Sequence, residues 1–126
     1  MMDTDRVIKI RGTVVKGAML GRKMSFPTIN LLYSELALPF GVYVSRVETP
    51  LGVYRGAMHF GPKSFAKNEE PSLEIHLLDF SGDLYGAQVI VEIFGKIRDV
   101  RKFDNTESLK RQIRLDVESV RSAVLE

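Results

Sequence analysis

Short segments with the composition of β-strands fill this chain up to about Lys102. They are rich in Val, Ile, Tyr and Phe and are bounded by Gly, Pro or Asp, as in a small sandwich or barrel. The expected strands cover residues 7–15, 28–32, 41–47, 53–59, 73–78 and 88–94. Turn signals at residues 48–52 and 81–83 predict antiparallel hairpins between the strands on either side. The sequence therefore predicts a mostly β fold.

The hydrophobic period changes near the end of the chain. Apolar residues recur there at spacings of three and four, which predicts one face of a helix: Leu109, Ile113, Val117, Val120 and Val124. Asp104 and Glu107 have the spacing of an N-terminal capping pair. We expect this helix to lie across the barrel and to bury its apolar stripe.

Length and composition limit the possible classes of protein. The 126 residues are enough for one domain, so residues 1–126 are expected to form a single unit. The chain has no apolar run of the roughly 18 residues that a membrane span needs and no secretory signal, so we expect a cytoplasmic protein with no membrane partner. The absence of cysteine excludes disulfides, thiolate catalysis and Cys-ligated metal sites. The net charge of +2 suits an anionic small ligand or a nucleic acid equally well.

Two neutral oxygen ligands follow a loop that is rich in glycine and basic residues. Thr28 and Asn30 are two residues apart on an extended backbone and so share one face, just beyond residues 16–23. They suit a Mg²⁺ ion that takes its other ligands from water and nucleotide phosphates, and the pattern points to phosphoryl transfer. The alternative is a turn after Pro27 in which both side chains bond to the local backbone. The loop is not a Walker A loop, and protein kinase signatures are missing.

The strand at residues 73–78 contains an acidic residue among apolar ones. Alternation sends Leu73, Ile75 and Leu77 into the barrel and Glu74 and His76 to the opposite face. In a polar cleft Glu74 could act as a general base toward a hydroxyl, whereas on an open face it would be an ordinary solvated side chain.

The two histidines and Arg98 also have both a structural and a functional interpretation. His59 and His76 are either hydrogen-bonded strand residues or acid–base groups. Arg98, which precedes Phe103, lies either on a solvated basic edge or beside an aromatic ring at the mouth of a ligand cleft.

Taken in order, these pieces resemble the riboflavin kinase family. The matching segments are Phe-Pro-Thr-Ile-Asn at 26–30, Leu-Pro-Phe-Gly-Val-Tyr at 38–43, Leu-Glu-Ile-His-Leu-Leu-Asp-Phe at 73–80, Asp-Leu-Tyr-Gly at 83–86, Ile-Arg at 97–98 and Lys-Phe at 102–103. The resemblance extends from about Ile10 to the final helix. It implies a six-stranded antiparallel Greek-key barrel with a C-terminal helix. It also implies transfer of the γ-phosphate of ATP to the ribityl 5′-hydroxyl of riboflavin, giving FMN and ADP.

The resemblance also implies residue roles. Thr28 and Asn30 would help to hold Mg²⁺, with Mn²⁺ or Zn²⁺ as alternatives, together with the phosphates, and Glu74 would be the general base. Arg98 and Phe103 would lie by the flavin. The remaining nucleotide-binding residues would be Lys16, Gly17 and Arg22 in the loop, with His76, Asp79 and Tyr85 nearby. The expected partners are riboflavin or FMN and ATP or ADP, with no nucleic acid, and we expect a monomer.

Some positions depart from the family pattern. The family usually has Gly where Ser25 stands and Ala where Ile29 stands, and its Asn-Ile-Gly…Pro-Thr-Phe segment is His-Phe-Gly-Pro-Lys-Ser-Phe at 59–65. In bacteria the resembling domain is commonly fused to an N-terminal adenylyltransferase, for which Met1 leaves no room, so we expect this chain to stop at FMN.

Two other hypotheses remain open at the sequence level. The first is a non-catalytic flavin- or nucleotide-binding module on the same barrel, which the departures favour. The second is a basic barrel that binds RNA through residues such as Arg98, Arg101, Lys102, Arg111 and Arg114.

Overall fold

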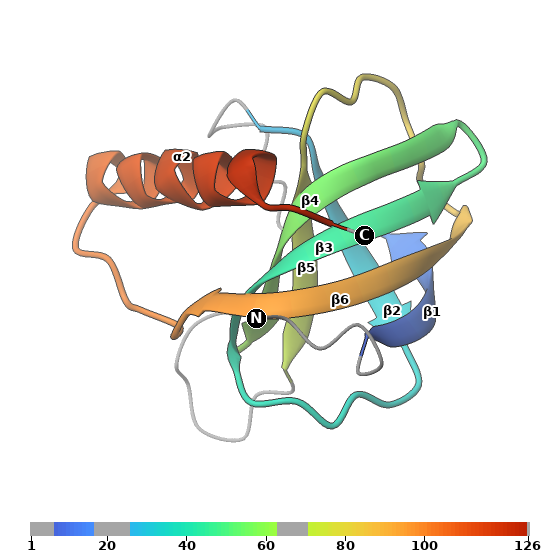
Figure 1. Ribbon diagram of the computed structural model, residues 1–126, viewed down its shortest axis with the longest axis horizontal. Coiled ribbons are helices and arrows are strands. Elements are labelled where there is room, and N and C mark those ends of the chain that lie inside the picture. Colours follow the sequence, from blue (N-terminus) through green and yellow to red (C-terminus); the bar gives the residue numbers. More distant parts are fainter. Residues whose placement is uncertain (1–6, 17–25, 63–70, 126) are drawn as a thin grey trace.

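The computed structural model describes residues 7–16, 26–62 and 71–125 (Figure 1). The elements are β1 (Ile8–Val15), β2 (Thr28–Tyr33), β3 (Gly41–Thr49), β4 (Gly52–Gly61), β5 (Ser72–Leu77), β6 (Gln88–Arg98) and α2 (Thr106–Ser122). The strands pair antiparallel and close into a barrel in the order β1-β2-β5-β4-β3-β6. Strands β3, β4 and β5 are consecutive neighbours and β6 returns beside β3, which is a Greek-key arrangement. The predicted fold class is confirmed.

The two predicted hairpins have different outcomes. The turn at 48–52 joins β3 to β4, with Thr49 opposite Gly52. The hairpin predicted at 81–83 is wrong, because β5 pairs with β2 and β4 whereas β6 pairs with β1 and β3. The chain does bend there, with a φ of +133° at Gly82, but both edges of β5 are already paired. It must therefore continue to the other side of the barrel before it enters β6.

Side-chain alternation separates an interior cluster from an outer one. The interior is filled by apolar residues from all the strands, among them Met58, Leu73, Ile75 and Ile93. The second cluster lies outside the barrel, where α2 packs on the sheet (Figure 1). Its buried members are Val42, Val44, Ala57, Leu78, Ile113, Val117 and Val120. The helix thus buries its apolar stripe against the outer face of β3 and β4, as expected.

The helix ends differ by small shifts from the prediction. Asn105, not Asp104, is the N-cap, because its Oδ1 accepts a hydrogen bond from the Ser108 amide at 2.8 Å. Val124 lies beyond the helix and is 82% exposed, so its place on the stripe was wrong. Arg55 on β4 donates to the carbonyls of Val120 and Ala123 at 3.1 and 2.6 Å, which satisfies acceptors at the helix C-terminus. Within the described ranges no helix is long and apolar enough to cross a bilayer.

Candidate active site

Four polar side chains meet on the outer face of two paired strands. Thr28 and Asn30 lie on β2, and His76 and Glu74 lie directly opposite them on β5. Their apolar neighbours Ile29, Leu31, Leu73 and Ile75 point into the barrel. We call the set of Thr28, Asn30, Glu74 and His76 the β2–β5 face. The alternation predicted for residues 73–78 is confirmed, and it brings the sequence-predicted metal ligands and base onto adjacent strands.

Thr28 is held by two hydrogen-bonding contacts. Its Oγ1 lies 2.8 Å from Nδ1 of His76 and 3.2 Å from the backbone carbonyl oxygen of Phe26. The ring of Phe26 meets the ring of His76 edge to face, with centroids 6.3 Å apart. The Thr28 hydroxyl is therefore fixed in place by β5 and by the residues that precede β2.

The Asn30 side chain has a buried oxygen for which the described residues provide no hydrogen-bond partner. This Oδ1 atom is the buried side-chain atom in the described part of the chain for which no partner is found. A buried unsatisfied acceptor costs about 1–3 kcal/mol, so native proteins rarely keep one without a use. Among the described residues, no hydrogen bond therefore accounts for this buried acceptor.

The β2–β5 face fits a hard divalent ion that arrives with other ligands. Among residues 7–16, 26–62 and 71–125, no group of three or more His, Cys, Asp or Glu side chains could hold a metal ion. The Asn30 carbonyl and the Thr28 hydroxyl are neutral oxygens, which alone bind such an ion weakly. They suit an ion whose remaining ligands are phosphate oxygens and water.

A row of cross-strand neighbours links this face to the far side of the barrel. From Asn30 on β2 it passes to Glu74 on β5, His59 on β4, Val42 on β3 and Arg98 on β6. We call these five residues the outer row. Because neighbouring strands are about 4.8 Å apart, Glu74 lies one step from Asn30 and roughly 14 Å along the curved sheet from Arg98. Glu74 therefore lies between the predicted metal ligands and the predicted flavin residue.

The two histidines beside Glu74 are neutral at pH 7. Burial lowers the pKa of His76 to about 4, with a smaller contribution from His59. Burial also lowers the pKa of His59, and the nearby positive charge of Arg98 acts in the same direction. Neutral imidazoles can serve here as hydrogen-bonding groups without adding positive charge beside Glu74.

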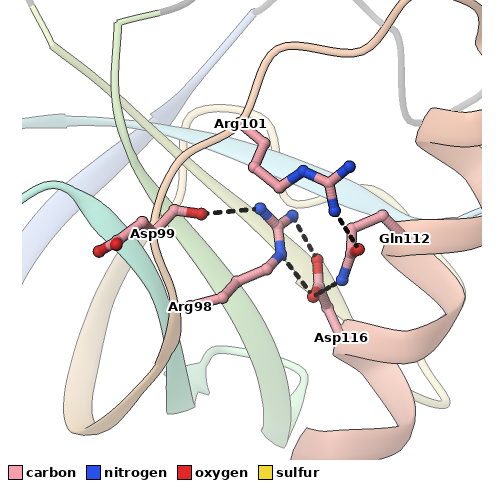
Figure 2. Close-up of polar contacts among 5 residues, drawn as sticks. All are labelled: Arg98, Asp99, Arg101, Gln112 and Asp116. Atoms are coloured by element: carbon pink, nitrogen blue, oxygen red, sulfur yellow. Dashed lines mark hydrogen bonds and ion pairs between the residues drawn. The ribbon is translucent and has the colours of Figure 1, made fainter.

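Arg98 is fixed by contacts with the helix (Figure 2). Its Nε and Nη2 donate to the two carboxylate oxygens of Asp116 at 2.8 and 2.7 Å, and Gln112 donates to the same carboxylate at 3.0 Å. Arg101 donates to the Gln112 side chain at 3.3 Å. We call Arg98, Arg101, Gln112 and Asp116 the β6–α2 cluster. The ring of Phe103 lies beside it, 5.0 Å from the guanidinium carbon of Arg101 and 5.9 Å from that of Arg98.

The other predicted nucleotide residues are divided between two places. Lys16 follows Val15, which pairs with Asn30, and its Nζ lies 5.5 Å from the ring centroid of the exposed Tyr85. These two residues are therefore near the β2–β5 face. Asp79 instead accepts hydrogen bonds from Arg121 of α2 at 3.1 and 3.4 Å. Gly17 and Arg22 lie outside the described residues.

Comparison with known proteins identifies the family. A family model described as Flavokinase, riboflavin kinase, matches residues 4–124. The chain belongs to the riboflavin kinase family. The sequence resemblance is confirmed over almost the whole chain.

Two riboflavin kinases and one solved structure match most of this chain. The RNA-binding riboflavin kinase RibR of Bacillus subtilis (strain 168) is 43% identical over 112 residues, which cover 88% of this chain and 49% of that protein. The bifunctional riboflavin kinase/FMN adenylyltransferase of the same strain is 38% identical, over 85% of this chain and 35% of the relative. The crystal structure of a macrolide-efflux protein from Streptococcus pneumoniae superposes with a TM-score of 0.84 at 34% identity, over 94% of this chain and 40% of that one. The chain thus spans half or less of the length of these proteins.

One departure from the riboflavin kinase pattern has a clear structural setting. Ile29, which replaces the usual Ala, is 6% exposed and points into the barrel interior, away from Thr28 and Asn30. The departure therefore changes the core and not the β2–β5 face. His59, which replaces the usual Asn, lies next to Glu74 in the outer row. Ser25 and Ser64 lie outside the described residues.

Sequence reasoning missed Asp116. This residue is 2% exposed and holds Arg98 in place, yet it lies on the apolar stripe between Ile113 and Val117. A carboxylate at such a position must find a buried partner, since an unpaired charge would be too costly. That signal was present in the sequence, although it did not identify the partner.

Proposed function

We propose that this chain is an ATP-dependent riboflavin kinase that makes FMN and ADP. The observation that carries the proposal is the buried oxygen of Asn30, which has no hydrogen-bond partner among residues 7–16, 26–62 and 71–125. It lies beside the Thr28 hydroxyl and one strand from Glu74. Membership of the riboflavin kinase family supports the choice of substrates. A protein that needed only a stable barrel would gain nothing from a buried acceptor that lowers its stability.

In this proposal Thr28 and Asn30 bind a divalent ion, for which Mg²⁺ is the best match to neutral oxygen ligands and phosphates. When bound, the ion would neutralise charge on the nucleotide phosphates. Mn²⁺ has similar ligand preferences, whereas Zn²⁺ prefers nitrogen and sulfur. Lys16 and Tyr85 lie near this end and are assigned to the nucleotide. The other residues that we propose to bind the nucleotide are Gly17, Arg22, His76 and Asp79.

Glu74 is proposed to accept the proton of the riboflavin 5′-hydroxyl. The hydroxyl oxygen forms a bond to the γ-phosphorus, the bond from that phosphorus to the β,γ-bridging oxygen breaks, and ADP leaves with the bond electrons. The proton on the Glu74 carboxyl then passes to solvent. Arg98 and Phe103, at the other end of the outer row, are assigned to the flavin ring. Placing the base between the two ends suits the in-line geometry that phosphoryl transfer requires.

The direct test is chromatographic detection of FMN after incubation with riboflavin, ATP and Mg²⁺. The Glu74→Gln variant removes proton acceptance but keeps size, so turnover should fall by about 10²–10⁴-fold while riboflavin affinity is unchanged. Glu48→Gln is the matched control, because Glu48 is an exposed strand residue outside the outer row. Unchanged turnover in Glu74→Gln would contradict the base assignment. If the wild-type chain makes no FMN, the non-catalytic binding module replaces the kinase.

RNA binding is a second candidate function. It is favoured by the similarity to the RNA-binding riboflavin kinase RibR of Bacillus subtilis and by exposed basic residues before and within α2, namely Lys102, Arg111 and Arg114. The Asp116 carboxylate neutralises the charge of Arg98, so this residue adds little attraction for RNA phosphates, whereas packing against a flavin ring needs no net charge. Fluorescence anisotropy with a labelled RNA hairpin tests it. An affinity that falls steeply between about 50 and 200 mM salt would support it, and no binding at low salt would reject it.

A further inference from the structure

The hydrogen-bonding capacity of the Thr28 hydroxyl determines the direction of its bond to His76. A hydroxyl has one proton and two lone pairs. The Thr28 Oγ1 atom lies within hydrogen-bond distance of an obligate acceptor, the carbonyl oxygen of Phe26, and of a ring nitrogen of His76. Both contacts are satisfied together only if the hydroxyl donates to Phe26 and His76 donates its Nδ1–H to Thr28. One lone pair of Oγ1 then remains for a further partner.

The rotation of the Thr28 side chain decides which atom faces outward beside Asn30. Threonine is β-branched, so a rotation of about 120° about χ1 exchanges its hydroxyl with its methyl group. The bond from His76 opposes that rotation. Because His76 lies opposite Thr28 on β5 and packs against the ring of Phe26, its own ring is also restrained.

We infer that His76 is a positioning residue, which donates Nδ1–H to Thr28 and so keeps the Thr28 oxygen available to the metal–nucleotide ligand that Asn30 also faces. The identity of that ligand rests on the proposed function. The inferred role of His76 does not require that phosphate is transferred. Residues that orient metal ligands typically change metal affinity by about 10–100-fold when they are replaced.

The first test reads the tautomer of the unliganded wild-type protein. Two-bond ¹H–¹⁵N correlation NMR distinguishes a protonated Nδ1 from a protonated Nε2, and the chain has only two histidines. The His59→Asn variant assigns the signals and restores the residue that is usual in the family. We expect His76 to carry its proton on Nδ1. A spectrum in which His76 is protonated on Nε2 alone would overturn the inference.

The second test measures the binding of Mn²⁺ together with ADP by electron paramagnetic resonance. His76→Phe keeps a ring beside Phe26 but has no donor, so the dissociation constant of Mn²⁺ should rise by about tenfold or more. His76→Asn keeps an N–H at nearly the position of Nδ1 and should restore most of the wild-type affinity. Riboflavin affinity without nucleotide should match the wild type in both variants. Equal Mn²⁺ affinity in His76→Phe and the wild type, or equal weakness in the Asn and Phe variants, would overturn the inference.

The experiments can reject the kinase activity and the positioning role of His76 independently of each other. If no FMN forms but Mn²⁺–ADP binding still depends on the His76 donor, the kinase proposal fails and the positioning role stands. If FMN forms and His76→Phe binds Mn²⁺–ADP normally, the kinase proposal stands and the positioning role fails. The NMR measurement needs no variant at position 76, so it decides the tautomer even if His76→Phe does not fold.

Discussion

The β2–β5 face and the β6–α2 cluster lie at opposite ends of the outer row. They differ in how fully their polar side-chain atoms are hydrogen-bonded. In the β6–α2 cluster the Asp116 carboxylate accepts two bonds from Arg98 and one from Gln112 (Figure 2). On the β2–β5 face the buried Oδ1 of Asn30 has no partner in the described part of the chain. A saturated polar cluster attaches one element to another. A buried acceptor left open is destabilising, and our proposal assigns this one to a ligand from outside the chain.

The largest effect should follow from removing the acid of the saturated cluster. Asp116→Ala leaves the Arg98 guanidinium, 16% exposed, without its carboxylate, so the free energy of unfolding should fall by about 3–5 kcal/mol. Urea denaturation followed by circular dichroism measures this change.

The matched control replaces both partners. Arg98→Met with Asp116→Leu removes the charges together and should recover most of the lost stability, because no buried charge remains unpaired. This double variant also tests the flavin assignment of Arg98, since weak riboflavin binding by a stable protein would support it. A double variant as unstable as Asp116→Ala would contradict the proposed origin of the effect.

Acidification should lower the free energy of unfolding, because His76 on the β2–β5 face takes up a proton more readily in the unfolded chain. Its folded pKa of about 4 lies below the ordinary value of 6.5, so the unfolded chain takes up the proton first. Stability attributable to His76 is therefore full above pH 6.5 and falls as the pH is lowered toward 4, by at most about 3 kcal/mol. Denaturant titrations of the metal-free protein over this range, compared with His76→Asn, should show a flatter profile in the variant.

Filling the open acceptor position with an apolar group should separate function from stability. Asn30→Leu removes, at similar volume, a buried carbonyl that has no partner among the described residues, so we expect thermal stability to be unchanged or higher. Turnover should fall by on the order of 100-fold because an oxygen ligand for the metal–nucleotide complex is lost. Melting curves and FMN assays on the same preparation test both expectations. A loss of stability without a loss of turnover would show that Asn30 is structural.

The smallest effect concerns a second saturated polar group. Arg55→Leu removes the donor to the carbonyls of Val120 and Ala123 and should lower the free energy of unfolding by about 1–2 kcal/mol. FMN formation should stay at the wild-type level, since Arg55 lies outside the β2–β5 face. A loss of turnover without a loss of stability would place Arg55 in the functional site instead.

Local alternation made the β2–β5 face predictable from the sequence. The period of two in residues 73–78 placed Glu74 and His76 opposite Leu73 and Ile75, and the structure confirms this arrangement. What the period could not show was which strand lies beside β5. That β5 pairs with β2 depends on how the barrel closes, and the same nonlocal closure made the hairpin predicted at 81–83 wrong.

The β6–α2 cluster was harder to predict because its parts depend on tertiary contacts. The strand expected to end at residue 94 continues to Arg98, and this extension brings Arg98 to the helix. Asp116 interrupts an otherwise apolar stripe, which a search for hydrophobic periodicity passes over. A charged residue on such a stripe predicts a buried partner, but the partner can be named only when both elements are in place.

The strand register has a consequence for how this chain can change over evolution. Thr28 and Asn30 reach the outer face only because β2 alternates, and Glu74 and His76 only because β5 does so in step. Inserting or deleting a single residue within either strand would turn the side chains beyond that point into the barrel interior. Substitutions in these strands can therefore be accepted one at a time, whereas changes of length should be confined to connections such as residues 34–40. Sequences that descend from the same ancestor should keep a constant spacing within β2 and β5 even where their amino acids have diverged.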